Sequence, residues 1–172
     1  MEYIKSKIRD VIDFPQKGIV FKDLTTAFKD ARALHIIGWD LGQLYRDKGI
    51  TKVVGIESRG FICGSIVAFE LGAGFVPARK PGKLPADVIS SSYQKEYGTD
   101  TIEMHADAIT TDDVVLIHDD VLATGGTMAA AIELVRKMHP RKIYVNFIIE
   151  LTALGGRQKF PADVEVTSLI QY

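Results

Sequence analysis

Residues 114–138 read VVLIHDDVLATGGTMAAAIELVRKM, and this stretch carries the pattern that decides the fold. Its first five residues, VVLIH at 114–118, form a compact apolar run of the kind found in strands that are covered on both faces. After a glycine-rich turn, apolar residues recur at helical spacing over 128–138, and Pro140 then ends the pattern. The stretch therefore predicts a buried strand, a tight turn and a helix.

The same alternation of strands and helices extends on both sides of this stretch. Apolar runs and helical segments follow one another along the chain, and this order is typical of an open, mostly parallel α/β sheet flanked by helices. A chain of 172 residues can bury such a core as a single domain, which we expect to cover 1–172. The further strands are predicted at 52–56, 74–78, 143–149 and 164–169, and the further helices at 30–48 and 60–71.

The composition is that of an ordinary globular protein and argues against several functional classes. Hydrophobic residues make up 47% and charged residues 25%, and the net charge of −1 gives no basic surplus for nucleic acid or an anionic membrane. Cys63 is the only cysteine, which excludes a disulfide within the chain and a cysteine-rich zinc site. The first residues contain no apolar signal core, and no apolar run is long enough to span a bilayer. We expect a soluble, cytoplasmic protein.

Residues 79–110 interrupt the regular alternation. This segment contains proline, glycine and many polar residues, and it is longer than most connections in a compact domain. Segments of this kind are functional loops or small flaps. We expect a flexible hood at 79–110, and we call these residues the hood segment.

The adjacent carboxylates and the glycine-rich turn together suit one kind of ligand. In an open parallel sheet, ligands bind at the carboxyl ends of the strands, where Asp119 and Asp120 are expected. Their oxygens can accept hydrogen bonds from a vicinal diol or hold a hydrated magnesium ion. Backbone N–H groups that converge at the start of a helix suit a phosphate, so the two features describe a ribose 5-phosphate. The turn, which we call the glycine turn, consists of Ala123, Thr124, Gly125, Gly126 and Thr127.

The stretch VVLIHDDVLATGGT resembles the phosphoribosyl pyrophosphate signature of the type I phosphoribosyltransferases. The resemblance runs through nearly the full chain. Block by block, the sequence is similar to that of the members that use adenine. The further blocks are DFPQKGIVFKDLT at 13–25, GIESRGFICG at 55–64, RKPGKLP at 79–85, EYG at 96–98 and ELTALGGRQK at 150–159.

This resemblance implies an enzyme of purine salvage. The expected reaction is that of a pentosyltransferase, in which adenine and phosphoribosyl pyrophosphate give AMP and pyrophosphate. The resemblance also implies Mg²⁺, bound mainly through the pyrophosphate and ribose hydroxyls of the substrate rather than by protein ligands, and it implies a homodimer.

The resemblance assigns expected roles around the sugar and its leaving group. Asp119 and Asp120 would hold the ribose hydroxyls, and the glycine turn would hold the 5-phosphate. The residues expected to contact pyrophosphate are Glu57, Ser58, Arg59 and Gly60, with a cis peptide between the first two, and the basic residues Arg79, Lys80 and Lys83, of which Arg79 crosses a dimer interface in some relatives.

Further expected roles concern the base. An N-terminal segment at 1–28 would form the adenine pocket, with backbone groups of Val20, Phe21 and Lys22 reading the purine edge. Phe21 would stack on one face of the base and Leu151 would cover the other. Within the hood segment, Glu96 would act as a general acid or base at adenine N7.

Two positions depart from the usual pattern of the family. Lys22 stands where relatives often carry arginine, which weakens any side-chain role in base selection but leaves a backbone contact intact. His118 replaces the usual aliphatic residue before the acidic pair, and we interpret it as a packed strand histidine rather than a proton-transfer group.

Two other functions remain open from the sequence. A phosphoribosyltransferase for a 6-oxopurine (hypoxanthine, guanine or xanthine) would share the ribose-phosphate signature. A regulator that senses phosphoribosyl pyrophosphate and binds nucleic acid would share it too, although the near-neutral charge argues against that reading.

Overall fold

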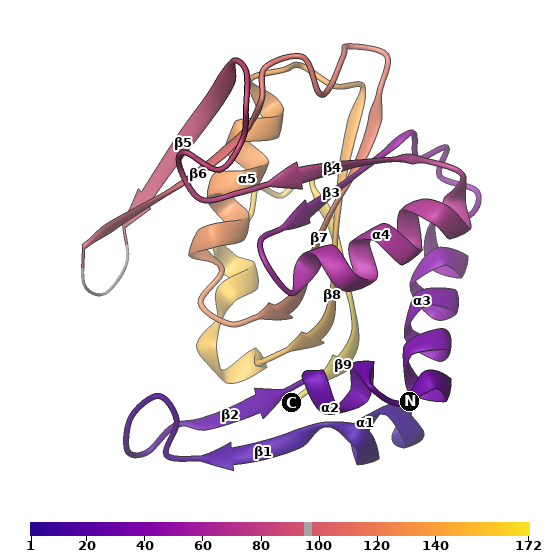
Figure 1. Cartoon of the computed structure of the whole chain (residues 1–172), viewed down its shortest axis with the longest axis vertical. Coiled ribbons are helices and arrows are strands. Elements are labelled where there is room, and N and C mark those ends of the chain that lie inside the picture. Colours follow the sequence, from indigo (N-terminus) through magenta and orange to yellow (C-terminus); the bar gives the residue numbers. More distant parts are fainter. Residues whose placement is uncertain (95–97) are drawn as a thin grey trace.

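The centre of the molecule is a five-stranded parallel sheet in the order β4-β3-β7-β8-β9 (Figure 1). The structure is a computed structural model and describes residues 1–94 and 98–172. The strands of this sheet are β3 (Lys52–Ile56), β4 (Gly74–Ala78), β7 (Val114–Leu122), β8 (Lys142–Glu150) and β9 (Glu165–Gln171). The predicted open parallel α/β fold is thereby confirmed.

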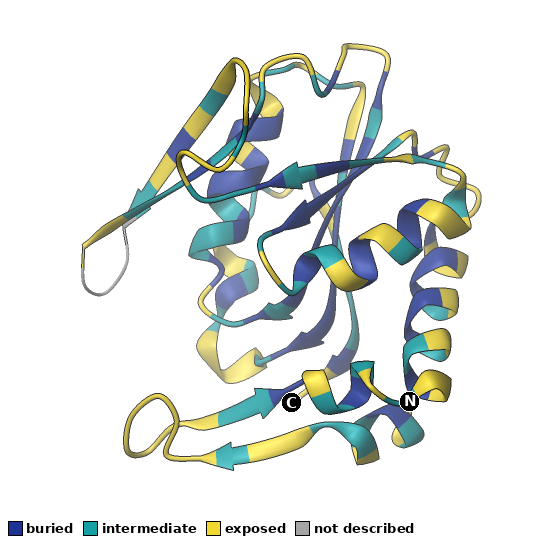
Figure 2. Cartoon of the chain, in the orientation of Figure 1, coloured by how far each residue is buried: buried dark blue, intermediate teal, exposed yellow. Residues whose placement is uncertain are grey.

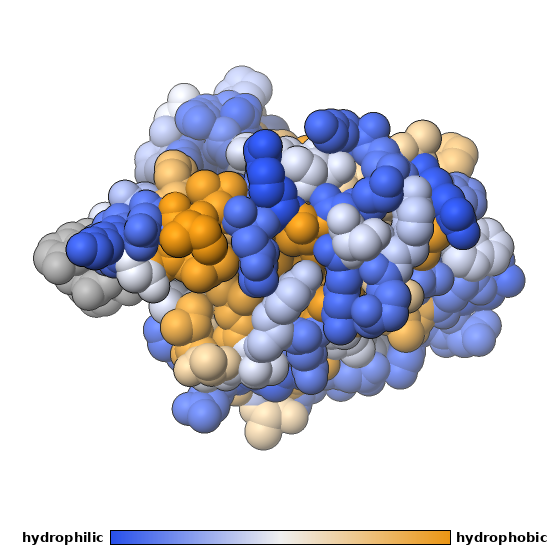
Figure 3. Space-filling view, turned by 90° about the horizontal axis from the view of Figure 1, so that it is seen from below, coloured by the Kyte–Doolittle hydropathy of each residue, from blue (hydrophilic) through white to orange (hydrophobic). Residues whose placement is uncertain are grey.

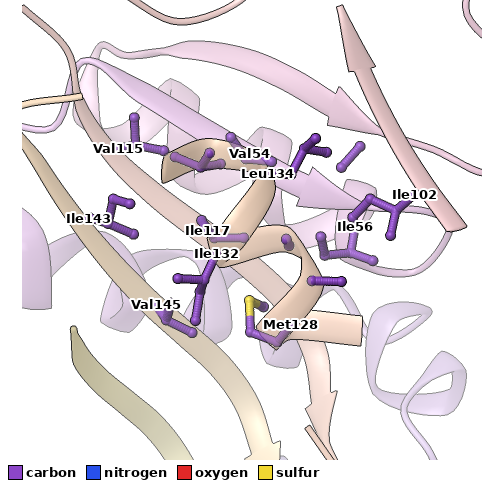
Figure 4. Packing of buried hydrophobic residues seen from close by; sticks show 14 of the residues in the cluster. Val54, Ile56, Ile102, Val115, Ile117, Met128, Ile132, Leu134, Ile143 and Val145 are labelled. Atoms are coloured by element: carbon purple, nitrogen blue, oxygen red, sulfur yellow. The ribbon is translucent and has the colours of Figure 1, made fainter. Parts of the chain in front are cut away.

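Helices cover both faces of this sheet. The long helix α3 (Ala31–Tyr45) and α4 (Gly60–Leu71) lie on one face, and α5 (Gly126–Arg136) lies on the other (Figure 1). Most of the sheet is buried, whereas the helices expose one side (Figure 2). Figure 4 shows Met128 and Ile132 of α5 packed near Ile117 and Val145 of the sheet. Within the described residues, no helix combines the length and apolarity that a membrane span requires.

The chain reverses its direction of travel across the sheet between β3 and β7. From β3 the chain passes through α4 to the edge strand β4, whereas from β7 it passes through α5 to β8 on the opposite side. The connections that leave the carboxyl ends of β3 and β7 therefore diverge, and a crevice opens between them. These connections carry the two motifs that the sequence singled out.

The N-terminal segment forms a small layer at one end of the sheet. It contains α1 (Glu2–Lys7), the antiparallel strands β1 (Arg9–Ile12) and β2 (Val20–Asp23), and α2 (Thr25–Phe28). The β1–β2 hairpin places Phe21 opposite Val11 and Lys22 opposite Asp10. Seen from this side, the surface mixes apolar and polar areas (Figure 3). The sequence predicted a base-binding segment here but not a hairpin.

The described residues of the hood segment include two strands. They form an antiparallel hairpin of β5 (Val88–Gln94) and β6 (Thr99–His105), which lies along α5 (Figure 1). Ile102 and Met104 of β6 are buried in the core beside α5. Alternate residues of β6 thus face the core and are apolar. This alternation is hard to recognise in the sequence because the rest of the segment is polar.

The predicted elements agree with the structure to within a few residues, with one consequential difference. Strands 52–56 and 74–78 and helix 60–71 have the predicted bounds. The strand predicted at 114–118 continues to Leu122, because Asp119, Val121 and Leu122 still pair with β8. The acidic pair therefore lies within the strand, near its carboxyl end, and not after it.

Candidate active site

A cavity of about 280 Å³ lies at the crevice between β3 and β7. One wall is the β3–α4 loop (residues 57–59), which follows β3, and the opposite wall is the acidic pair of β7 with Thr127 at the start of α5. A third wall comes from Arg79 and Lys80 at the root of the hood segment. Segments that are far apart in the sequence thus converge on one space.

The β3–α4 loop approaches β7 closely because Gly60 has no side chain. A Cβ atom on Gly60 would lie 3.0 Å from the carbonyl oxygen of His118 and 3.1 Å from Oδ1 of Asp119. The peptide between Glu57 and Ser58 in this loop is cis, as the resemblance implied. The predicted loop therefore rests directly against the acidic pair.

The two carboxylates of the acidic pair have different surroundings. Asp120 is buried and forms an ion pair with Arg59 of the β3–α4 loop. Asp119 is half-buried, borders the main cavity, and accepts a hydrogen bond of 2.9 Å from the backbone N–H of Asp120. Burial, reinforced by the nearby negative charge of Asp120, raises the pKa of Asp119 well above its ordinary value. The pair thus combines one anchored anion with one carboxyl that binds a proton readily.

The glycine turn borders a second, smaller cavity of about 90 Å³, which shares Asp119 and Thr127 with the first. Gly125 adopts φ +78°, a conformation that favours glycine, and α5 begins immediately after it. The cavity therefore lies at a helix N-terminus, where backbone N–H groups and the helix dipole favour an anion. All five residues of the turn line this cavity, as do Val121 and Leu122 of β7.

The basic residues of the hood segment converge on Glu57. Its carboxylate accepts hydrogen bonds from Arg79 Nη2 at 3.0 Å, Lys83 Nζ at 2.7 Å and the backbone N–H of Lys80 at 3.0 Å. The Arg79 guanidinium, helped by Lys83, lowers the pKa of Glu57 to about 2. Lys80 Nζ forms a separate ion pair with Asp100. Glu57 thus holds the cationic root of the hood at the edge of the cavity.

A third pocket, of about 310 Å³, lies between the N-terminal hairpin and the β3–α4 loop. Phe21 and Phe14 pack edge to face there, with ring centroids 5.2 Å apart, and Arg59 lies over the Phe21 ring at 5.5 Å. Val11 and Asp23 also line this pocket. The space is apolar enough on one side for an aromatic base and borders the main cavity through Arg59.

Three residues predicted for the base lie differently from Phe21. Lys22 points to the other face of the hairpin, where its Nζ binds Asp10 at 2.8 Å and lies over the Tyr172 ring. Val20 is exposed at the tip end of β2. Leu151 follows β8, and its N–H donates to the carbonyl of Leu122 at 2.9 Å. The described residues that line the Phe21 pocket do not include Val20, Lys22 or Leu151.

Two residues of the hood hairpin belong to the site although the sequence analysis assigned them no role. Tyr93 of β5 and Ile102 of β6 line the main cavity, because the hairpin of the hood segment folds over it. In the sequence, Tyr93 and Ile102 are only an aromatic and an aliphatic residue within a polar stretch, and nothing else about them indicates a site. Glu96, the predicted general acid or base, lies outside the described residues.

A support beneath the glycine turn also escaped the sequence analysis as a site feature. Gly156, in the short helix η2 (Gly156–Lys159) that follows η1 (Thr152–Leu154), touches the backbone of Gly125. Arg157 fixes this segment through Glu150 at 3.0 and 2.5 Å and through the Val166 carbonyl at 2.6 Å. In the sequence, the block at 150–159 is marked only by its resemblance to the family.

The residues present suit a metal ion that arrives with its substrate. In the described part of the chain, no three His, Cys, Asp or Glu side chains are grouped to bind a metal ion. The main cavity nevertheless offers the acidic pair and Glu57 beside several cations. Mg²⁺ commonly binds through one or two carboxylates together with substrate phosphates, so this donor set fits the ion in that mode.

Comparison with known proteins places the chain in one family. A family model described as a phosphoribosyl transferase domain matches residues 26–165. The adenine phosphoribosyltransferase of Bacteroides thetaiotaomicron is 60% identical over 169 residues, covering 98% of this chain and 96% of the relative. That of Geobacter metallireducens is 51% identical over the full length of both chains.

Solved structures give the same result. A crystal structure of adenine phosphoribosyltransferase from Rhodothermus marinus superposes with a TM-score of 0.93 at 52% identity, covering 99% of this chain and 97% of that one. The enzyme from Giardia lamblia, complexed with 9-deazaadenine, superposes with a TM-score of 0.91 at 46% identity, covering 98% and 96%. The chain therefore belongs to the phosphoribosyltransferase family, in the branch of the adenine phosphoribosyltransferases.

Proposed function

We propose that the chain transfers the phosphoribosyl group of phosphoribosyl pyrophosphate to adenine, forming AMP and pyrophosphate in purine salvage. One observation carries this proposal: the acidic pair, the glycine turn and the cationic root of the hood segment surround two adjoining cavities that share Asp119 and Thr127. A relative from Saccharomyces cerevisiae was solved with adenine and an imino-altritol bisphosphate, and one from Trypanosoma brucei with AMP, pyrophosphate and ribose-5-phosphate.

The proposed roles follow the charges that develop during the reaction. The bond from ribose C1 to adenine N9 forms as the bond from C1 to pyrophosphate breaks. Pyrophosphate leaves with the electron pair, and the imidazole proton of adenine passes from N7 to Glu96 acting as a base. Asp119 and Asp120 hold the ribose hydroxyls and lie close to the sugar as it becomes cationic. The glycine turn, Ala123 to Thr127, binds the 5-phosphate. Such preorganised charges stabilise the transition state without reorganisation during the reaction.

The leaving group needs positive charge on the opposite wall. Arg79, Lys80 and Lys83, with Ser58 and Arg59 of the β3–α4 loop, would contact the departing pyrophosphate, since guanidinium groups grip phosphate oxygens bidentately. Glu57 keeps the cationic side chains in place, and Gly60 allows the loop to reach the acidic pair. When bound, Mg²⁺ would neutralise charge on the pyrophosphate, held mainly by substrate oxygens with Asp119 and Asp120 nearby.

Adenine would occupy the pocket beside Phe21. The Phe21 ring offers a stacking surface, and the backbone groups of Val20 and Lys22, its neighbours in β2, would read the purine edge. The proposed contribution of Lys22 is limited to its backbone, because its side chain is held by Asp10. Leu151 as a cover for the base and Glu96 as a general acid or base at N7 are part of the same proposal.

We also propose that the working enzyme is a homodimer in the cytoplasm. Phe69 and Ile62 on the outer face of α4 are 84% and 40% exposed, and exposed apolar side chains of this size favour burial against a partner. Light scattering after gel filtration at micromolar concentration tests the dimer: a monomer at all concentrations contradicts it.

The activity is tested by product formation and by base competition. Labelled adenine and phosphoribosyl pyrophosphate with Mg²⁺ should give AMP, and unlabelled hypoxanthine, guanine or xanthine should not compete. A 6-oxo group needs a donor where the amino group of adenine needs an acceptor. Strong competition by a 6-oxopurine assigns the chain to that substrate class instead, and the absence of any nucleotide product rejects the proposal.

A further inference from the structure

The hydroxyl of Tyr93 connects the hood segment to the glycine turn. Thr127 Oγ1 donates a hydrogen bond of 2.9 Å to Tyr93 Oη, and Tyr93 Oη donates one of 3.1 Å to Asp100 Oδ2. Lys80 Nζ forms an ion pair with the same carboxylate. A single chain of contacts thus runs from the start of α5, through the hairpin, to the root of the hood segment.

The direction of these hydrogen bonds is fixed by chemistry. An ionised carboxylate only accepts, so the proton of the Tyr93 hydroxyl must point to Asp100. Tyr93 Oη can then meet Thr127 only as an acceptor, so the proton must come from Thr127. A threonine hydroxyl has one proton, and Thr127 cannot donate to Tyr93 and to another acceptor at the same time.

Thr127 also lines the small cavity of the glycine turn, where an anion is favoured. A phosphate there carries only acceptor oxygens, so it competes with Tyr93 for the single proton of Thr127. If the phosphate takes that proton, Thr127 Oγ1 becomes an acceptor. The Tyr93 hydroxyl can then satisfy it only by turning its own proton away from Asp100.

The rest of the hairpin is held independently of this link. Lys137 Nζ donates to the Ser90 carbonyl at 2.8 Å, and Ser91 Oγ donates to Glu133 Oε2 at 3.4 Å, both towards the far end of α5. Ile89 packs against the core beside them. A change at Tyr93 therefore alters the contact nearest the glycine turn without detaching β5.

We propose that Tyr93 is a positioning residue that couples occupation of the glycine turn to the hood segment. Without a phosphate, Thr127 donates to Tyr93, which holds Asp100. A sugar 5-phosphate takes the Thr127 proton, Tyr93 donates to Thr127 instead, and Asp100 loses that donor but keeps Lys80. The inference rests on the proposed function, because it assumes that a phosphorylated sugar binds at the glycine turn.

The coupling is tested by the affinity of the full chain for ribose 5-phosphate, measured by calorimetry. Phosphate binding to the natural chain costs one of the two hydrogen bonds that join Thr127, Tyr93 and Asp100, whereas in Tyr93→Phe nothing competes for the Thr127 proton. We therefore expect Kd to fall about threefold to tenfold in Tyr93→Phe, the range of one net hydrogen bond. The same substitution in a Thr127→Val background should leave Kd unchanged, since no hydroxyl remains to be shared.

Ser91→Ala provides the matched control, because it removes a hydrogen bond between β5 and α5 far from the glycine turn, and its Kd should equal that of the natural chain. If Tyr93→Phe does not fold, Asp100→Asn carries the test, because a neutral amide holds the Tyr93 proton less strongly and Kd should again fall. An unchanged or higher Kd in the folded variant, or an equal change in both Thr127 backgrounds, overturns the inference. Absence of ribose 5-phosphate binding to the natural chain rejects the proposed function as well.

Discussion

Gly125 and Gly156 touch backbone to backbone beneath the glycine turn. A Cβ atom on Gly125 would lie 2.4 Å from the carbonyl oxygen of Gly156, and one on Gly156 would lie 2.2 Å from the carbonyl oxygen of Ala123. Real Cβ atoms do not approach backbone oxygens so closely, so either segment would have to move if it carried a side chain. The conformation of the turn therefore depends on a residue about thirty positions further along the chain.

We predict that Gly156→Ala displaces the glycine turn and weakens binding of the sugar phosphate. Since the N–H groups of the turn would no longer converge, KM for phosphoribosyl pyrophosphate should rise at least about tenfold, the loss of roughly one charge-assisted hydrogen bond. Steady-state kinetics measure this effect. Gly155→Asn is the matched control: Gly155 has φ +61°, which asparagine tolerates, and its Cβ would make only ordinary contacts at 3.5 Å. Equal kinetics in both variants would contradict the role of the Gly125–Gly156 contact.

Phe21→Ala should impair adenine binding while sparing the sugar. Loss of a stacking ring costs about 1 to 3 kcal/mol per base, so KM for adenine should rise about tenfold to a hundredfold. KM for phosphoribosyl pyrophosphate should change less than about threefold. The residues proposed to bind it line the main cavity, which Arg59 separates from the Phe21 pocket. Trp39→Ala, at an exposed position on α3, controls for loss of an aromatic ring elsewhere. A rise confined to the KM of phosphoribosyl pyrophosphate would place adenine outside the Phe21 pocket.

Asp119→Asn should make the chain more stable and less active. Because the pKa of folded Asp119 is raised, the folded state binds a proton at pH values where the unfolded aspartate is already ionised. Stability attributable to this group therefore falls as pH rises above about 3.8 towards the raised pKa. At pH 7 the asparagine variant should gain on the order of 1 kcal/mol, because it removes the cost of burying a charge and the repulsion between that charge and Asp120.

Urea unfolding at several pH values measures this gain, and the activity of Asp119→Asn should fall about a hundredfold, as when one electrostatic group of a catalytic site is removed. Asp47→Asn, at an exposed position after α3, should change neither quantity. A variant that is less stable than the natural chain at pH 7 would show that Asp119 carries its charge without cost.

Glu57→Gln should have the opposite effect on stability. The pKa of Glu57 falls from 4.5 to about 2, so its stabilising contribution is complete above pH 4.5 and is lost as pH falls towards 2. At pH 7 we expect the glutamine variant to lose about 2 kcal/mol in the free energy of unfolding, and the difference should disappear near pH 2. Acid titrations of both chains, followed by circular dichroism, check this. A difference that is constant with pH would mean that Glu57 acts through packing alone.

Much of the fold could be predicted from local patterns. The apolar runs at 52–56 and 74–78 are strands with those bounds, because strands covered on both faces are apolar throughout. The order of strands and helices fixed the parallel sheet, and the spacing of the acidic pair and the glycine turn placed them on one strand–turn–helix unit. These features depend on residues that are close together in the chain, so the local sequence pattern is enough to predict them.

Only the tertiary structure decided which distant residues meet. It placed Gly156 beneath Gly125, brought Tyr93 to Thr127, gathered the cations of the hood segment on Glu57, and turned Lys22 away from the Phe21 pocket. Each of these depends on how strands pair and how a hairpin packs on a helix. The chain by itself thus determined the architecture and the chemistry of its groups, whereas packing determined their distances, because contacts between remote segments leave no periodic trace in the sequence.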